Sequence, residues 1–233
     1  MAKGVAVLVG ALLLFVGAQA PTRADTRNPA TCRDDAMIVF DASGSMAGTD
    51  MNSSPVAPRI AKVKDALARV LPSVAAGRNL GLIDYGPGPY NRCDNIELQL
   101  EPMPDAAGAI MSVVDSLVPA GRTPLTSAVR EAAKVLDFPD KPAVVVLLTD
   151  GEETCGGDPC ELAQMLRAKG AHLTVHVIGY RTRDGSTGMG MLQSRCLADA
   201  TGGLYVSAET TDELVAAFQK TLGCPIVSQS RLP

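Results

Sequence analysis

The segment AVVVLLTDG, residues 143–151, decides the fold of this chain. Its first six residues are apolar without polar alternation, which is typical of a strand buried on both faces. The Thr-Asp-Gly that follows marks the point where this strand would leave the core. Strands of this kind belong to parallel sheets that helices cover on both sides. We therefore expect a mainly parallel sheet in which residues 143–148 form a fully buried strand.

Other apolar runs and helical periodicities alternate on both sides of this segment. Residues 96–100 alternate apolar and polar side chains, which predicts a half-exposed edge strand, antiparallel to its neighbour. The other expected strands are residues 35–40, 80–85, 172–178 and 203–207. The expected helices are residues 60–71, 106–117, 125–136, 160–169, 191–200 and 211–222, the last one capped by Thr211. This alternation predicts an α/β fold, a doubly wound, mainly parallel six-stranded sheet with helices on both faces.

The amino-acid composition agrees with one α/β domain and argues against two other kinds of chain. The chain has 233 residues, 20% of them charged, with a net charge of -4. This balance argues against a disordered chain and against a nucleic-acid-binding protein, which needs a clustered basic surface. With no Trp, four Phe and four Tyr, the core is expected to be aliphatic.

The N-terminal residues have the pattern of a signal peptide. A basic start at residues 1–3 is followed by an apolar run over residues 5–18, which is short for a membrane span. A retained membrane anchor is the alternative. We expect cleavage after Ala18 or Ala24 and a periplasmic or secreted protein without a stable membrane anchor. The expected division is a leader at 1–24, a lead-in at 25–34, the domain at 35–224 and a tail at 225–233.

The cysteines fit the same compartment. Their number is even, and an exported chain meets oxidising conditions, so disulfides are expected rather than buried free thiols. The spacing of Cys155 and Cys160, with no second close pair, does not indicate zinc. The six are Cys32, Cys93, Cys155, Cys160, Cys196 and Cys224.

Three polar segments are expected at the carboxyl edge of the sheet, where open α/β sheets bind ligands. They are DASGS at residues 41–45, GRTPL at 121–125 and TDG at 149–151. From these segments, two carboxylates and three of the hydroxyls form a donor set that suits Mg²⁺, with Mn²⁺ or Ca²⁺ as alternatives, and does not suit zinc. An ion held this way stays partly positive and would attract a carboxylate from outside. The candidate metal ligands are Asp41, Ser43, Ser45, Thr123 and Asp150.

These segments resemble the von Willebrand factor type A (VWA) domain with its metal-ion-dependent adhesion site. The resemblance covers about residues 35–222, and the GRTPL loop and residues 149–160 are similar to bacterial exported members. It implies that the serine and threonine hydroxyls touch the metal while both acids act through water. It also implies a Rossmann-like strand order of 3-2-1-4-5-6 and metal-dependent protein binding or adhesion.

The implied strand order also bears on the disulfides. A bond between Cys155 and Cys160 would leave Cys93 and Cys196 three strands apart, about 14 Å at the sheet. That exceeds the roughly 7 Å between Cα atoms that a disulfide allows, so only long loop excursions could join them. Many exported relatives join the two ends of the domain. The favoured pairings are Cys32–Cys224, Cys93–Cys155 and Cys160–Cys196.

The function expected from this resemblance is binding of a protein ligand that presents an Asp or Glu carboxylate, by a monomer without enzymatic activity. An aspartate-based, Mg²⁺-dependent phosphohydrolase is one alternative. It needs a second acid two residues after the nucleophile, where this chain has Ser43. A structural module with a non-essential metal site is the other alternative.

Several of these residues also have simpler explanations. Ser43, Ser45 and Asp150 could cap helices, although a cap explains only one of the two serines. Glu152 and Glu153 are interpreted as a solvated acidic rim. His172 and His176 are expected to be structural histidines on one face of a strand. The loops at 46–58 and 86–93 are the expected determinants of partner choice.

Overall fold

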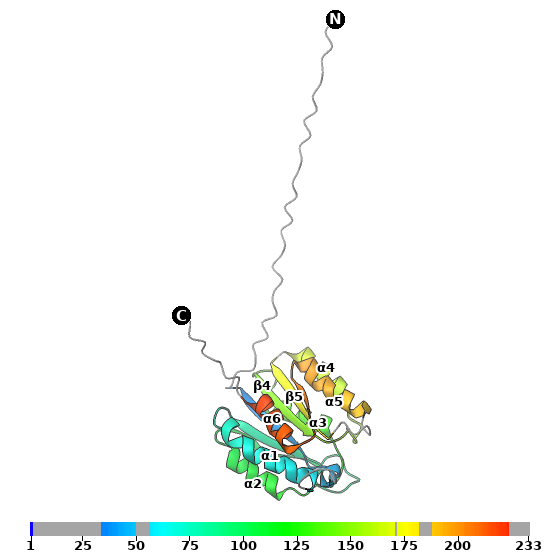
Figure 1. The fold of residues 1–233 in the computed structure, drawn as a ribbon. Helices are drawn as coiled ribbons and strands as arrows, with labels where there is room; N and C mark the ends of the chain where they lie inside the picture. Colours follow the sequence, from blue (N-terminus) through cyan, green and yellow to red (C-terminus); the bar gives the residue numbers. More distant parts are fainter. Residues whose placement is uncertain (2–33, 50–55, 171, 182–187, 224–233) are drawn as a thin grey trace, which may run out of the picture.

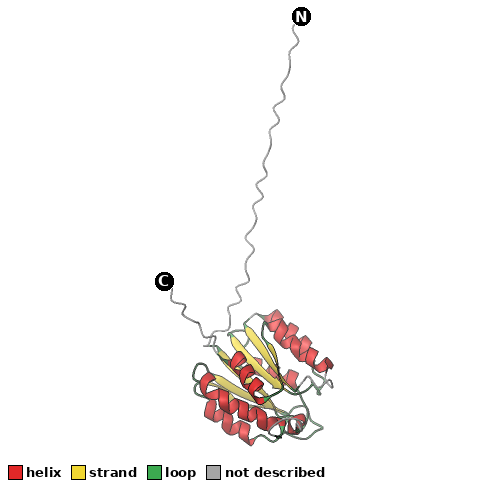
Figure 2. Cartoon of the chain, viewed as in Figure 1, coloured by secondary structure: helices red, strands yellow, loops and turns green. Residues whose placement is uncertain are grey.

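The computed structural model describes Met1 and residues 34–49, 56–170, 172–181 and 188–223. A sheet forms its centre, with helices on both sides (Figures 1 and 2). The strands are β1 Asp35–Asp41, β2 Leu80–Tyr85, β3 Ile96–Met103, β4 Ala143–Thr149, β5 Leu173–Tyr180 and β6 Tyr205–Ala208. The helices are α1 Arg59–Val74, α2 Ala107–Ser116, α3 Leu125–Val135, α4 Pro159–Lys169, α5 Gly188–Thr201 and α6 Thr211–Leu222, with a short 3₁₀ helix η1 at Gly44–Ala47.

The six strands follow the order β3-β2-β1-β4-β5-β6. All neighbours pair in parallel except β2 and β3, which are antiparallel. Every residue of β2 and β4 is buried, whereas β3 is half exposed, as its alternating sequence predicts. The predicted α/β class, the doubly wound sheet and its antiparallel edge strand are confirmed.

Two apolar cores lie on opposite faces of the sheet. One packs α1, α2 and α6 against alternate residues of the strands, and the other packs α3, α4 and α5 against the opposite residues. Within β1, Ile38 and Phe40 face the first core while Met37 and Val39 face the second. This two-sided burial explains why the central strands lack polar alternation.

Two local predictions differ from the structure. The N-cap of α6 is Thr210, not Thr211: its hydroxyl accepts from the Glu213 N–H, and the Glu213 carboxylate accepts from the Thr210 N–H in return. This capping box needs Glu three residues after the cap, a spacing that Thr210 satisfies and Thr211 does not. In addition, β5 begins at Leu173, so His172 precedes the strand.

Two disulfides lie within the described residues. Cys93 is bonded to Cys155, with 5.6 Å between their Cα atoms, and Cys160 is bonded to Cys196, with 5.0 Å. These are the two pairings that the implied strand order favours, of the three expected from the sequence. The third, Cys32–Cys224, lies outside the described residues, as do the proposed leader after Met1 and the tail. None of the helices in the described ranges has the length and apolar character that crossing a membrane requires.

Candidate metal-binding site

The candidate site lies where β1 and β4 end side by side. Phe40 is paired with Leu148, so Asp41 and Thr149, the next residues along each strand, end at the same level. The chain leaves β1 toward α1 on one face of the sheet and leaves β4 toward α4 on the other. The place where two neighbouring strands lead to opposite faces of the sheet is called its switch point. Open α/β sheets hold ligands in the crevice at this point.

Asp41 is fully buried and both of its carboxylate oxygens accept hydrogen bonds. The Ser43 N–H donates to Oδ1 at 2.8 Å, and the Thr149 hydroxyl donates to Oδ2 at 2.9 Å. The first bond bends the chain around the carboxylate, and the second joins the ends of β1 and β4. Asp41 is therefore fixed in place by its own loop and by the neighbouring strand.

Asp150 lies beside the two serines of the DASGS segment. The Ser45 hydroxyl donates to Asp150 Oδ1 at 2.5 Å, and Ser43 Oγ lies 3.1 Å from Ser45 Oγ. The second oxygen, Oδ2, accepts from Arg59 Nη1 at 3.0 Å. Side chains from η1 and α1 thus both donate to the one carboxylate of Asp150, in the loop after β4.

Thr123 is brought to the same edge by backbone contacts. The Gly44 N–H donates to the Gly121 carbonyl at 3.1 Å, which joins the GRTPL loop to the DASGS turn. The Thr123 N–H donates to Thr154 Oγ1 at 2.8 Å, and the Thr154 N–H donates to the Thr123 carbonyl at 3.1 Å. The side chain of Thr123 is buried. The five candidate ligands, Asp41, Ser43, Ser45, Thr123 and Asp150, are therefore carried by three segments joined at this edge.

Close backbone crossings require glycine at two positions of this edge. Gly86 has a φ of +113°, and a Cβ there would lie 2.3 Å from the Ser43 nitrogen. Gly121 has a φ of +70°, and a Cβ there would lie 2.3 Å from the Gly86 carbonyl oxygen. Neither space nor backbone conformation admits a larger residue at either position.

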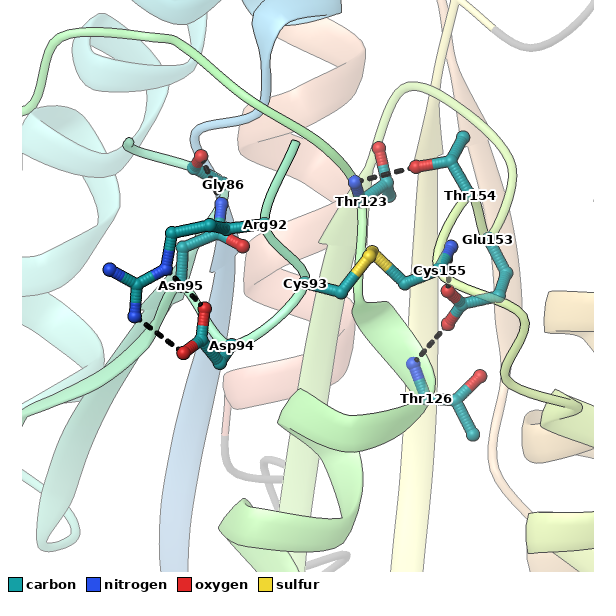
Figure 3. The surroundings of a disulfide bond; sticks show 10 residues. All are labelled: Gly86, Arg92, Cys93, Asp94, Asn95, Thr123, Thr126, Glu153, Thr154 and Cys155. Atoms are coloured by element: carbon teal, nitrogen blue, oxygen red, sulfur yellow. Dashed lines mark hydrogen bonds and ion pairs between the residues drawn. A yellow bond between two sulfur atoms is a disulfide. The ribbon is translucent and has the colours of Figure 1, made fainter. Parts of the chain in front are cut away.

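Glu153 is not part of a solvated rim, which corrects its interpretation from the sequence. One carboxylate oxygen accepts from the Thr126 N–H at 2.9 Å and the other from the Cys155 N–H at 2.7 Å (Figure 3). Thr126 lies in the first turn of α3, where free N–H groups favour a carboxylate. Glu153 thus fastens the loop after β4 to the start of α3. Glu152 is half buried.

The disulfide Cys93–Cys155 joins this loop to the loop between β2 and β3 (Figure 3). On the β2–β3 side, the Asn95 side-chain amide donates to the Gly86 carbonyl, and Arg92 pairs with Asp94. The disulfide therefore connects the segment that holds Thr123 with the segment that packs on Ser43.

Burying two carboxylates together raises the pKa of both. The pKa of Asp41 rises to about 6, first because of burial and then because of the charge of Asp150, against the opposing effect of its hydrogen bonds. Burial also raises the pKa of Asp150, which the Ser45 hydroxyl and the Arg59 guanidinium partly counteract. Two partly uncompensated buried carboxylates beside neutral hydroxyls form a donor set that suits a hard divalent cation.

The simpler explanations do not account for these residues. The N-cap of α4 is Asp158, which accepts from the Cys160 and Glu161 N–H groups, so Asp150 is not that cap. Ser43 precedes η1 but makes no side-chain capping bond there, and the N-cap of α1 is Pro58. Helix capping therefore explains neither Ser43 nor Asp150.

The histidines lie apart from this edge. His176 Nδ1 accepts from the Leu204 N–H at 3.0 Å, a structural role of the kind expected. His172 is exposed before β5. Within the described ranges, no group of three or more His, Cys, Asp or Glu side chains is arranged to hold a metal ion. A metal bound at the candidate site would therefore depend on hydroxyl ligands as well as on the two carboxylates.

Four contributors to the site were not identified from the sequence. Thr149 holds Asp41, Thr154 holds Thr123, Glu153 holds the loop and Arg59 holds Asp150. Thr149 stands directly before Asp150 at the end of the predicted strand, and this position could have identified it as a residue of the site. Arg59 is 91 residues from Asp150 in sequence, and no local pattern distinguishes it from an ordinary exposed helix residue.

Comparisons with known proteins agree with this architecture. The profile of the von Willebrand factor type A domain matches residues 36–153. YwmD of Bacillus subtilis, itself uncharacterized, is 31% identical over 192 residues, which cover 78% of this chain and 82% of that protein. YwmC of the same organism, also uncharacterized, is 28% identical over 221 residues, covering 91% and 93% of the two chains.

Solved structures share the fold at low sequence identity. A von Willebrand factor type A structure from Catenulispora acidiphila superposes with a TM-score of 0.59 at 19% identity, covering 82% of this chain and 42% of that one. Proximal thread matrix protein 1 of the mussel byssus gives a TM-score of 0.57 at 20% identity, covering 83% and 47%. The chain thus spans less than half the length of these two structures. On the profile match and the similarity to YwmD, this chain belongs to the von Willebrand factor type A domain family.

Proposed function

We propose that this chain is a protein-binding module whose candidate site holds one divalent cation, most suitably Mg²⁺. Ser43, Ser45 and Thr123 would supply hydroxyl ligands, and Asp41 and Asp150 would act behind water. The observation that carries this proposal is the convergence of two buried carboxylates and two serine hydroxyls at the switch point of the sheet. When bound, the ion would supply a Lewis-acidic position for one further oxygen ligand.

The partner that fits this site is a protein that presents an Asp or Glu carboxylate. Two carboxylates do not occupy all the coordination positions of a hard cation, and an anionic oxygen is the ligand that such an ion favours. The β2–β3 loop carries Tyr90, which is 76% exposed, and the Arg122 guanidinium lies 6.0 Å from the centre of its ring. Arg122 stands directly before Thr123 in sequence. We propose that Tyr90, in the loop at 86–93, contacts the partner together with Arg122. Of the loop at 46–58, residues 50–55 lie outside the described residues.

We further propose that the chain is exported, with residues 1–24 removed. Two disulfides among the described residues support this, because such bonds persist in oxidising compartments. A mature N terminus at residue 19 or 25 is expected from N-terminal sequencing of the natural protein. An intact Met1 on the mature protein would contradict export by cleavage.

The proposal is binding without turnover. A phosphohydrolase built on Asp41 would need an acid where Ser43 stands, and Ser43 instead lies against Ser45. Release of phosphate from a generic ester, lost in Asp41→Asn, would favour that alternative.

Titration of Mg²⁺ into chelator-stripped protein tests the metal site. We expect one equivalent to bind, with the affinity lost in Asp41→Asn. The matched control is Asp84→Asn, because Asp84 is also a buried strand carboxylate but is hydrogen-bonded to Gln99 rather than to the site. Binding that survives in Asp41→Asn, or that is lost equally in both variants, would contradict the assignment.

A further inference from the structure

Arg59 is placed where its charge acts on the candidate site rather than on its own helix. It is the first residue of α1, whose first turn contains no acidic side chain. A positive charge at a helix N-terminus is opposed by the helix dipole, so the helix gains nothing electrostatically from Arg59. The side chain instead extends to Asp150, with Nη1 3.0 Å from Oδ2.

The position of Arg59 is fixed by the turn that carries the serines. Its N–H donates to the Gly48 carbonyl at 2.9 Å, and Gly48 in turn donates to the Ser45 carbonyl at 2.9 Å. The Asp150 side chain is fully buried, whereas that of Arg59 is 24% exposed. The ion pair therefore faces solvent only from the arginine side.

This ion pair changes the charge of the site. Asp41 and Asp150 together contribute two negative charges, and the guanidinium, which stays protonated at any ordinary pH, returns one positive charge. A divalent cation added to the three groups leaves a net charge of +1. Without Arg59, the same cation would leave the site neutral.

We propose that Arg59 is a built-in counter-cation of the metal site. It lowers the affinity for the divalent ion and keeps the loaded site positive, so that a carboxylate from a partner completes the charge balance. This inference rests on the proposed function and adds a residue that sets its ligand preference.

The competing role for Arg59 is simply to orient Asp150. The two roles predict opposite results, because loss of an orienting contact weakens metal binding whereas loss of a competing charge strengthens it. The other oxygen of Asp150 already accepts from Ser45, and Asp41 is held by Ser43 and Thr149. Orientation of the two carboxylates thus has supports besides Arg59, which favours the charge effect.

The first experiment is calorimetric titration of Mg²⁺ alone into chelator-stripped protein at fixed ionic strength. Removing one positive charge near the ion in Arg59→Gln should tighten binding by about tenfold, as expected for a charge effect at a partly exposed site. Arg59→Met serves as a second neutral variant, so that the test can still be made if one of the two neutral variants fails to fold. Arg59→Lys keeps the charge and should stay within about threefold of the wild type.

Arg69→Gln is the matched control for this series. Arg69 lies on the same helix and pairs with Asp65 and Asp212 at the surface, so its removal makes the same change in net charge away from the site. Its Mg²⁺ affinity should equal that of the wild type. Circular dichroism and melting in chelator identify the variants that are folded.

The second experiment uses acetate as a simple carboxylate. With Mn²⁺ in the site, water bound to the ion enhances proton relaxation, and acetate that displaces this water lowers the enhancement. The neutral variants should need several-fold more acetate than the wild type and Arg59→Lys, because their loaded site is no longer positive.

The outcomes separate the two proposals. Mg²⁺ affinity that is unchanged or weaker in the neutral variants overturns the role of Arg59 while leaving the metal site intact. A wild-type protein that binds no Mg²⁺ overturns the proposed function itself. Tighter Mg²⁺ binding together with weaker acetate binding in the neutral variants supports the counter-cation.

Discussion

At the scale of single residues, the site is built from side chains whose burial opposes their charge. Asp41 is fully buried, and its neighbour Asp150 is nearly so. The Asp41 carboxylate accepts hydrogen bonds from Ser43 and Thr149. The Asp150 carboxylate accepts hydrogen bonds from Ser45 and Arg59. Because these donors are fixed before any ligand arrives, a cation would meet an oxygen cluster that is already assembled.

Burial also opposes the charge of His176, but here the charged form is a cation, so the pKa is lowered rather than raised. Burial, assisted by the positive charge of Arg78, lowers its pKa to about 4. The folded state therefore keeps the imidazole neutral while the unfolded chain protonates it near its ordinary pKa of about 6.5. The stability contributed by neutral His176 is complete above about pH 6.5 and is lost as the pH falls toward 4.

Urea unfolding at a series of pH values tests this prediction. Between pH 7 and pH 4.5, His176→Gln should lose less unfolding free energy than the wild type, by a difference on the order of 2 kcal/mol. Glutamine offers an acceptor for the Leu204 N–H without titrating. His172→Gln is the control, since that imidazole is exposed. Parallel pH profiles for the wild type and His176→Gln would contradict the assignment.

At the scale of elements, the loops at the carboxyl edge act as one connected unit. The disulfide Cys93–Cys155 anchors the loop after β4, and the two residues before Cys155 hold Thr123 and the start of α3. The other disulfide, Cys160–Cys196, joins α4 to α5 instead. One bond therefore supports the candidate site directly and the other supports only the helical layer.

Removing each disulfide in turn separates these roles. The chain-entropy relation gives a similar loss of stability for both, roughly 4 kcal/mol at most, because the bridged separations of 62 and 36 residues enter as logarithms. Replacing Cys93 and Cys155 by Ser should also weaken Mg²⁺ binding several-fold, because Thr123 loses its anchored support. Replacing Cys160 and Cys196 by Ser should leave Mg²⁺ affinity unchanged. Equal Mg²⁺ affinities in the two double variants would show that the loop needs no anchor.

Elements with a strong periodic pattern could be predicted from the sequence, whereas their contacts could not. The apolar run at 143–148 has no plausible alternative to a buried strand, and the structure places it as β4. The cap of α6 was assigned one residue too late because two threonines stand side by side. Glu153 and Arg59 were missed for a different reason, since each acts on a segment distant in sequence, at the start of α3 and at the end of β4.

At the scale of the whole molecule, the sheet order positions the site. Alternating strands and helices predict a doubly wound sheet but do not determine which strands are neighbours. The order β3-β2-β1-β4-β5-β6 was implied by the family resemblance, and it places the ends of β1 and β4 together. The three polar segments meet because of that order, since they are separated by about 80 and 30 residues along the chain. Local sequence patterns contain no information about such long-range neighbours.

The proposed function requires a divalent cation at the switch point between β1 and β4. A crystal structure of protein grown with Mn²⁺ tests it directly, because the anomalous signal of manganese locates the ion independently of the protein atoms. We expect one strong anomalous peak in contact with the Ser43, Ser45 and Thr123 hydroxyls, with Asp41 and Asp150 around it. No peak at these hydroxyls, or a peak only at another cluster such as Asp84 and Glu97, would contradict it.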